Sequence, residues 1–107
     1  MSENSQRSAL TEAVFYILLS LYSPLHGYGI MQNIKELSNG RVNLGPGTLY
    51  GAINTLLEKN WIELQDSDFR KKTYRITQLG KTVIQDELLR LEELLANGNR
   101  IAGRESK

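Results

Sequence analysis

The sequence predicts a mainly α-helical domain with a small β-hairpin, followed by a last helix. Three observations favour this fold class. Three apolar stripes with helical spacing precede residue 60, two short segments of alternating apolar and polar residues follow, and another helical stripe begins at residue 78. A chain of 107 residues fits one domain with a modest hydrophobic core.

The first helix is expected after a polar segment, residues 1–8, which predicts a flexible N-terminus. Ser8 or Thr11 can cap this helix, because a hydroxyl oxygen accepts a hydrogen bond from a free backbone N–H. Its apolar stripe runs through residues 10–21. Pro24 ends the helix, since proline disfavours helical geometry at the residue before it.

A second helix is expected from about His26 to Leu37. Either Asn39 or Gly40 can end it in the left-handed conformation that follows many helices. Residues 41–44 are then expected to form a short connector, with a minor strand as the alternative. His26 is interpreted as a structural residue rather than as a ligand.

A third helix is expected from Pro46, which suits the first turn, with Gly45 as its N-cap and an end near Asn60. Its buried stripe contains Leu49, Ile53, Leu56 and Leu57. Its other face is small, uncharged and rich in hydrogen-bonding groups: Gly47, Thr48, Tyr50, Gly51, Asn54 and Thr55. Solvated helices carry Lys and Glu, so this face favours a close polar partner. An ordinary solvated helix is the alternative.

Residues 61–65 and 72–77 alternate apolar and polar side chains, and turn-forming residues separate them, so they predict a β-hairpin. The inward positions are Ile62, Leu64, Tyr74 and Ile76. Arg70, Lys71 and Lys72 make the tip or the returning edge basic. Three helices followed by a hairpin predict a winged helix-turn-helix domain over residues 9–77.

The last helix is expected over residues 78–97, with Thr77 as its cap and an end at Asn97-Gly98. Four of its apolar residues have the spacing of a coiled coil: Ile84, Leu88, Leu91 and Leu95. Because the preceding elements already account for a core, this face predicts self-association. Residues 98–107 are expected to form a disordered tail.

Composition excludes several classes of function. Without cysteine the chain has no disulfide and no thiolate zinc site, and its single histidine forms no metal cluster, so no cofactor is expected. No apolar run is long enough for a membrane span and no signal peptide is recognised, so a cytoplasmic location is expected. Adjacent carboxylates such as Glu92 and Glu93 do not converge on one substrate, and the sequence predicts no enzyme.

The formal net charge is only +1, but the charges are unevenly distributed. Residues 69–81 contain five basic and no acidic side chains, whereas residues 84–95 are mainly acidic. Salt screens charges beyond about 8 Å, so a local basic segment can attract a polyanion from a nearly neutral protein. Protection of a strand edge against aggregation is the alternative role for these lysines.

Three segments resemble the PadR family of bacterial transcription regulators: Leu25-His26-Gly27-Tyr28-Gly29-Ile30, Gly45-Pro46-Gly47-Thr48-Leu49-Tyr50 and Lys72-Thr73-Tyr74-Arg75-Ile76-Thr77-Gln78-Leu79-Gly80. The resemblance spans about residues 9–95, and the single last helix is similar to that of the shorter PadR subfamily, which includes the multidrug-responsive regulator of lactococci. It implies a homodimeric repressor that binds a palindromic operator in double-stranded DNA and dimerises through the last helix.

Two positions depart from this family pattern. Gly45 stands where the family often has serine, so a side-chain cap is lost. The last helix lacks the aromatic residue that stacks on the drug in the lactococcal regulator, and the only tryptophan, Trp61, begins the hairpin. A small aromatic effector could instead bind in an apolar cavity between the last helices of a dimer.

The predicted DNA-binding set is Tyr28, Gly47, Thr48, Tyr50, Gly51, Asn54, Arg70, Lys71 and Lys72. Tyr28 belongs to it because the resemblance implies a phosphate contact there, and packing is the alternative; the alternatives for Thr48 and Tyr50 are a hydrogen bond at the helix start and a half-buried ring. Hydroxyls and cations in this set suit phosphate, the two helical glycines allow close backbone approach, and Asn54 can pair with adenine. The dimerisation set is Ile84, Leu88, Leu91 and Leu95. The alternative function is a winged-helix module that binds protein rather than DNA, with Tyr50 and Trp61 as anchors.

Overall fold

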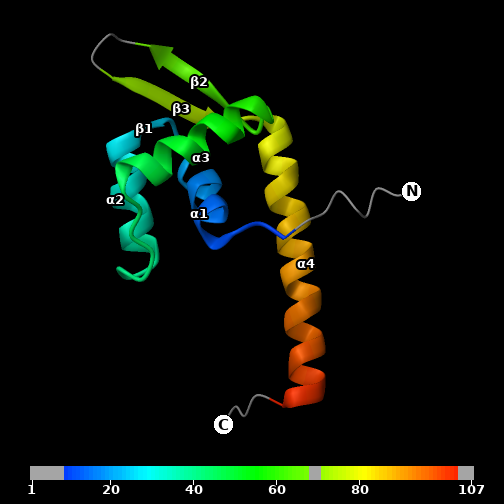
Figure 1. Ribbon diagram of the computed structural model, residues 1–107. Coiled ribbons are helices and arrows are strands. Elements are labelled where there is room, and N and C mark those ends of the chain that lie inside the picture. Colours follow the sequence, from blue (N-terminus) through cyan, green and yellow to red (C-terminus); the bar gives the residue numbers. More distant parts are fainter. Residues whose placement is uncertain (1–8, 68–70, 104–107) are drawn as a thin grey trace.

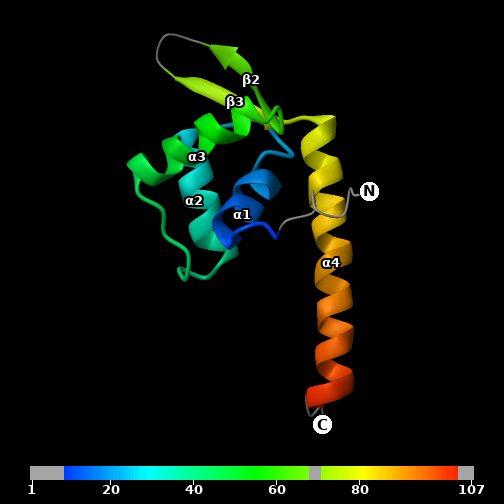
Figure 2. The ribbon, with the colours of Figure 1, turned by 45° about the vertical axis from the view of Figure 1, so that its right-hand side comes forward.

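The computed structural model describes residues 9–67 and 71–103. In chain order these residues form α1 (Glu12–Ser20), β1 (Leu25–His26), α2 (Gly27–Leu37), α3 (Pro46–Glu58), β2 (Ile62–Ser67), β3 (Lys72–Ile76) and α4 (Gln78–Ala102). Helices α1, α2 and α3 pack beneath the sheet, and α4 passes beside α1 before its second half extends away from the other elements (Figures 1 and 2). The mainly helical fold class with a winged hairpin is thereby confirmed.

Side chains cap the first two helices. The Thr11 hydroxyl accepts the Val14 N–H at 3.1 Å, and His26 Nδ1 accepts the Gly29 N–H at 3.0 Å. Helix α1 ends at Ser20, before proline requires it to end. Both Asn39 and Gly40 adopt positive φ after α2, at 55° and 80°, so the two residues share the turn for which either one was expected.

Helix α3 has the predicted limits, with Pro46 as its first residue and an extended Gly45 before it. Asn60 then adopts a φ of 63°, and the Trp61 N–H returns to the Leu56 carbonyl at 3.1 Å. This turn leads directly into β2. The predicted stripe is confirmed at Leu49, Ile53 and Leu56, which are buried, while Leu57 is half-buried.

The wing has a third strand that the sequence pattern did not indicate. The antiparallel order is β1-β3-β2, and Leu25 and Leu64 both align with Tyr74. Among the described residues, 41–44 form a connector without a strand, and the short strand that pairs with β3 is β1. Leu64 was expected to be buried, but it is 45% exposed and lies where the register shifts before Asp66.

The core draws on every long helix and on the hairpin. Its buried apolar members are Ile17, Leu18, Leu21, Ile30, Ile34, Leu49, Ile53, Leu56, Ile62, Tyr74, Ile76 and Ile84. The membership of Ile84, which is 1% exposed, corrects its assignment to the dimerisation set. The first half of α4 completes the protomer's own core, so the expectation that the core closes without this helix was wrong.

Helix α4 is capped as predicted, because the Thr77 hydroxyl accepts the Gly80 N–H at 3.0 Å. Its predicted end was wrong: Asn97 and Gly98 remain helical, and the helix ends at Ala102, before a left-handed Gly103. Residues 98–102 therefore belong to the helix rather than to a disordered tail. The expected N-terminal segment, residues 1–8, lies outside the described residues.

A close approach fixes the start of α4 against the wing. A Cβ added at Gly80 would lie 2.6 Å from Ile76 Cγ1 and would also meet the Trp61 backbone. The Thr77 hydroxyl further donates to the Asn60 carbonyl at 2.7 Å, which links the start of α4 to the end of α3. Over the described ranges, none of the helices combines the length and apolarity needed to cross a bilayer.

Candidate nucleic-acid interface

The outer face of α3 is smooth, open and uncharged. Gly47, Thr48, Gly51 and Asn54 are all exposed. A Cβ added at either Gly47 or Gly51 would find no atom within 4 Å outside the local helix, so the backbone is accessible at both positions. The predicted character of this face is therefore present in the folded chain.

A hollow of about 310 Å³ lies beside α3, between the start of α2 and the wing. Its lining residues are His26, Gly27, Tyr28, Tyr50, Lys71, Lys72 and Tyr74. We call this hollow the tyrosine–lysine pocket. It brings together four members of the predicted DNA-binding set, Tyr28, Tyr50, Lys71 and Lys72, from α2, α3 and the wing. Arg70, also in that set, lies outside the described residues.

The two predicted tyrosines of the pocket have different surroundings. Tyr28 is 64% exposed, and its hydroxyl oxygen accepts a hydrogen bond from Gln32 Nε2 at 3.2 Å. A hydroxyl that accepts in this way keeps its own proton for another acceptor. Tyr50 lies against the backbone of Gly27 rather than standing free on the face of α3.

Two further residues of the pocket, His26 and Tyr74, were not in the predicted set. His26 acts as the α2 cap, which agrees with its structural interpretation. Burial raises the pKa of the Tyr74 hydroxyl, and the nearby Tyr50 phenol raises it further. Both residues reach the pocket through the pairing of β1 with β3, and a strand of two residues is too short to show periodicity in a sequence.

The remaining described cations of the basic segment have partners elsewhere. Arg75 Nε donates to Glu63 Oε2 at 2.6 Å across the hairpin. The Lys81 ammonium lies 5.6 Å from the centre of the Tyr22 ring. Within the described part of this segment, Lys71 and Lys72 are therefore the cations that line the pocket.

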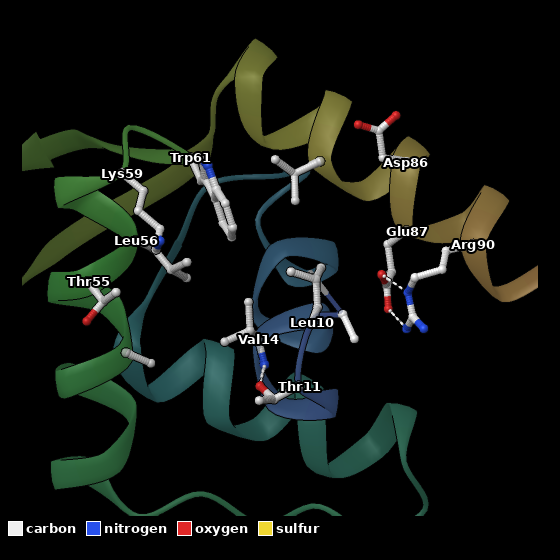
Figure 3. A pocket seen from close by; sticks show the side chains of 13 residues that line it. Leu10, Thr11, Val14, Thr55, Leu56, Lys59, Trp61, Asp86, Glu87 and Arg90 are labelled. Atoms are coloured by element: carbon white, nitrogen blue, oxygen red, sulfur yellow. Dashed lines mark hydrogen bonds and ion pairs between the residues drawn. The ribbon is translucent and has the colours of Figure 1, made fainter. Parts of the chain in front are cut away.

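A larger hollow of about 570 Å³ lies between the start of α1, the end of α3 and α4 (Figure 3). We call it the interhelical groove. Trp61 lines it together with Leu10, Val14 and Leu56, and the Lys59 ammonium lies 5.1 Å from the centre of the indole. Tyr50 and Trp61, the anchors of the alternative protein-binding function, thus line different hollows.

A partly buried ion pair borders the interhelical groove (Figure 3). Arg90 donates to both carboxylate oxygens of Glu87, at 2.8 and 2.6 Å, and Glu87 is 5% exposed. The hydrogen bond from Arg90 lowers the pKa of Glu87, against burial, which raises it. The ion pair with Arg90 therefore favours the ionised carboxylate at this position of α4.

From residue 88 onward, α4 carries apolar side chains in solvent. Leu88, Leu91 and Leu95 of the predicted dimerisation set are exposed, as are Leu89, Leu94 and Ile101. Sequence reasoning missed Ile101 because it ended the helix near residue 96. A helix face of this kind is typical of a segment that packs against another chain.

Comparisons with known proteins are consistent with this architecture. The model of the Transcriptional regulator PadR-like family matches residues 15–86. An uncharacterized 37.1 kDa protein in transposon TN4556 of Streptomyces fradiae is 36% identical over 64 residues, and the match covers 60% of this chain but only 18% of that protein.

Solved structures of transcriptional regulators share the fold, and two of them serve as examples. A transcriptional regulator from Clostridium thermocellum superposes with a TM-score of 0.72 at 23% identity, over 94% of this chain and 97% of that one. A PadR family transcriptional regulator from Eggerthella lenta gives 0.69 at 21% identity, over 86% and 82% of the two chains. The family match covers most of the winged helix and the first part of α4, and the chain belongs to the PadR-like family of transcriptional regulators.

Proposed function

We propose that this protein is a sequence-specific DNA-binding regulator that acts as a homodimer on a palindromic operator and represses transcription by occupying it. One observation carries the proposal. Tyr28, Tyr50, Lys71 and Lys72 come from three separate elements and line one pocket beside the open face of α3. Hydroxyls and cations gathered in this way suit the phosphates of a polyanion, and an uncharged face beside them suits base edges.

Helix α3 would enter the major groove with its first three turns. Gly45 makes no side-chain cap hydrogen bond, so the departure from serine leaves the first N–H groups of α3 free to donate to a phosphate. Gly47 and Gly51 let the backbone approach the duplex closely. Thr48 can donate to a phosphate or a base edge, and Asn54 suits the paired donor and acceptor of adenine.

The tyrosine–lysine pocket would hold the flanking backbone. Lys71 and Lys72 supply positive charge, and the Tyr28 and Tyr50 hydroxyls supply neutral donors. Such contacts position a protein on DNA without reading the sequence. In this proposal the tyrosine–lysine pocket contributes affinity, and the face of α3 contributes sequence specificity.

The exposed leucines of α4 support the homodimer, because burying them between two copies removes apolar surface from water. A twofold dimer would present two copies of α3 to one face of DNA. The expected operator is an inverted repeat whose half-sites lie about one helical turn, roughly 34 Å, apart.

A small aromatic effector that releases the DNA belongs to the same proposal. Its support is the interhelical groove, where Trp61 and aliphatic side chains from the helices offer apolar contact. An occupant would touch both α3 and α4, and so could change their relative position. Titration of phenolic compounds into the protein–DNA complex tests this part, and loss of complex is expected for a true effector.

Selection of bound duplexes from a random pool tests the main proposal. We expect an enriched inverted repeat, and Asn54→Ala should weaken binding to it by about 5- to 150-fold, the value of one base contact. Thr82→Ala, which changes an exposed residue of α4, is the matched control and should bind as the parent does. Failure to enrich any motif over the starting pool would contradict sequence-specific binding.

A further inference from the structure

Gly27 is buried at the first position of α2, and the space where its side chain would stand is occupied by Tyr50. A Cβ added there would lie 2.6 Å from Tyr50 Cζ and 3.2 Å from its Cε1, and it would also meet the hydroxyl oxygen. The phenol therefore rests directly on the backbone where α2 begins. Among the helical glycines, Gly47, Gly51 and Gly98 have open space instead.

Space, rather than backbone conformation, makes this position special. Gly27 does not have a positive φ, so an alanine could adopt the same backbone conformation there. Alanine also favours a helix more than glycine does. An alanine side chain at this position would displace the phenol of Tyr50.

We propose that Gly27 is a positioning residue for DNA binding, because it provides the seat that holds the Tyr50 hydroxyl in the tyrosine–lysine pocket. The inference rests on the proposed function. A seated ring is held in the pocket that Lys71 and Lys72 also line before DNA arrives, so little rotamer freedom is lost on binding. The same contact joins the start of α2 to α3 and so helps to set the angle of the helix that meets the duplex.

Displacing the Tyr50 ring from Gly27 would also affect the face of α3. Tyr50 is 43% exposed, so its ring borders solvent and has room to swing outward. The nearest open space on its own helix lies over Gly47 and Gly51, which have no close neighbours. A displaced ring would thus cover the surface at Gly47 and Gly51 that is proposed to approach the DNA. It would keep the helix backbone farther from the duplex.

A double-mutant cycle tests the seat, with Gly98→Ala as the matched glycine control. Binding is measured on the duplex selected by the parent protein, and folding by urea denaturation. Gly27→Ala and Tyr50→Ala should each weaken binding by about tenfold, the value of one hydrogen bond to a charged group. The double variant should bind no more weakly than Tyr50→Ala, because the glycine acts only through the ring.

The outcomes are distinguishable. Gly27→Ala that folds and binds as the parent does, or a double variant whose loss is the product of the two single losses, overturns the seat and leaves the proposed function standing. If Gly27→Ala alone unfolds, a folded double variant supports the seat, and an unfolded one overturns it. A parent protein that prefers no duplex overturns the proposed function and this inference together.

Discussion

Helix α3 turns one face to solvent, and α4 is exposed on all sides from residue 91 onward, but the side chains that matter on the two helices differ in chemistry. The face of α3 has glycine, threonine and asparagine, with open space above its glycines. The face of α4 has leucines and an isoleucine. Small polar groups suit a hydrated polyanion that must come close, whereas leucines gain only from an apolar partner. The contrast supports the proposal that α3 contacts DNA and that α4 pairs with a second copy of the chain.

Introducing charge on α4 is expected to have the largest effect on dimerisation and DNA binding. Leu91→Glu combined with Leu95→Glu places carboxylates on the leucine face, so sedimentation should show monomers. Loss of paired recognition should then weaken operator binding by about 10²- to 10⁴-fold. Glu92→Gln, an exposed neighbour, is the control. Dimers that persist with full affinity would contradict the role given to α4.

The two halves of α4 provide a second contrast. Ile84→Ala should lower the free energy of unfolding by about 2–5 kcal/mol, because it leaves a cavity in the protomer's core. Leu91→Ala should change stability only through dimerisation, so its effect should depend on protein concentration. Urea denaturation at several concentrations measures both. A concentration-independent loss for Leu91→Ala would place that residue in the core as well.

The fold was largely predictable from the sequence because its helices are marked by apolar spacing, by Thr11 and Thr77 as caps, and by Pro46 at the start of α3. Ile84 could not be assigned correctly, since one unbroken stripe serves the core and then the solvent-exposed half of α4. The end of that helix was missed because Asn97-Gly98 resembles a stop, yet both residues are tolerated inside a long helix.

The individual residues of the candidate site were predictable from the sequence, but the pocket that brings them together was not. Chemistry singled out Tyr28, Tyr50, Lys71 and Lys72 separately, and the structure brings them to one pocket. The seat at Gly27 and the membership of Tyr74 depend on how α2, α3 and β3 approach each other in space. Contacts of that kind leave no periodic signal along the chain.

The salt dependence of DNA binding tests whether the lysines of the tyrosine–lysine pocket contact phosphates. Lys71→Ala with Lys72→Ala should reduce the slope of log affinity against log salt concentration by about 0.9 for each phosphate that the lysines no longer neutralise. Lys35→Ala, an exposed cation in the last turn of α2, is the control and should leave the slope unchanged. Fluorescence anisotropy over a salt series measures the slope. An unaltered slope in the double variant would remove the wing from the interface.

The smallest expected effect is on the free energy of unfolding at acid pH, through Glu87 of α4. The Glu87 pKa is lowered from its ordinary value of 4.5, so the ionised carboxylate stabilises the fold at neutral pH. That stability is present above the ordinary pKa and is lost as pH falls through the lower pKa of the folded state. Glu87→Gln should therefore flatten the acid side of the stability profile.

Urea midpoints measured from neutral pH down to about pH 3 give this profile. Glu93→Gln, on the exposed half of α4, is the control and should retain the acid loss of the parent. A Glu87→Gln profile with the same acid slope as the parent would contradict the stabilising role of the ion pair with Arg90.

The most direct test of the assignment of DNA to α3 is an amide NMR titration of the whole protein with its selected duplex. The largest shift changes are predicted at residues 27–28, 47–54 and 71–72, with small changes along the leucine half of α4. Changes concentrated on α4 or around Trp61, with α3 and the wing unmoved, would contradict the account.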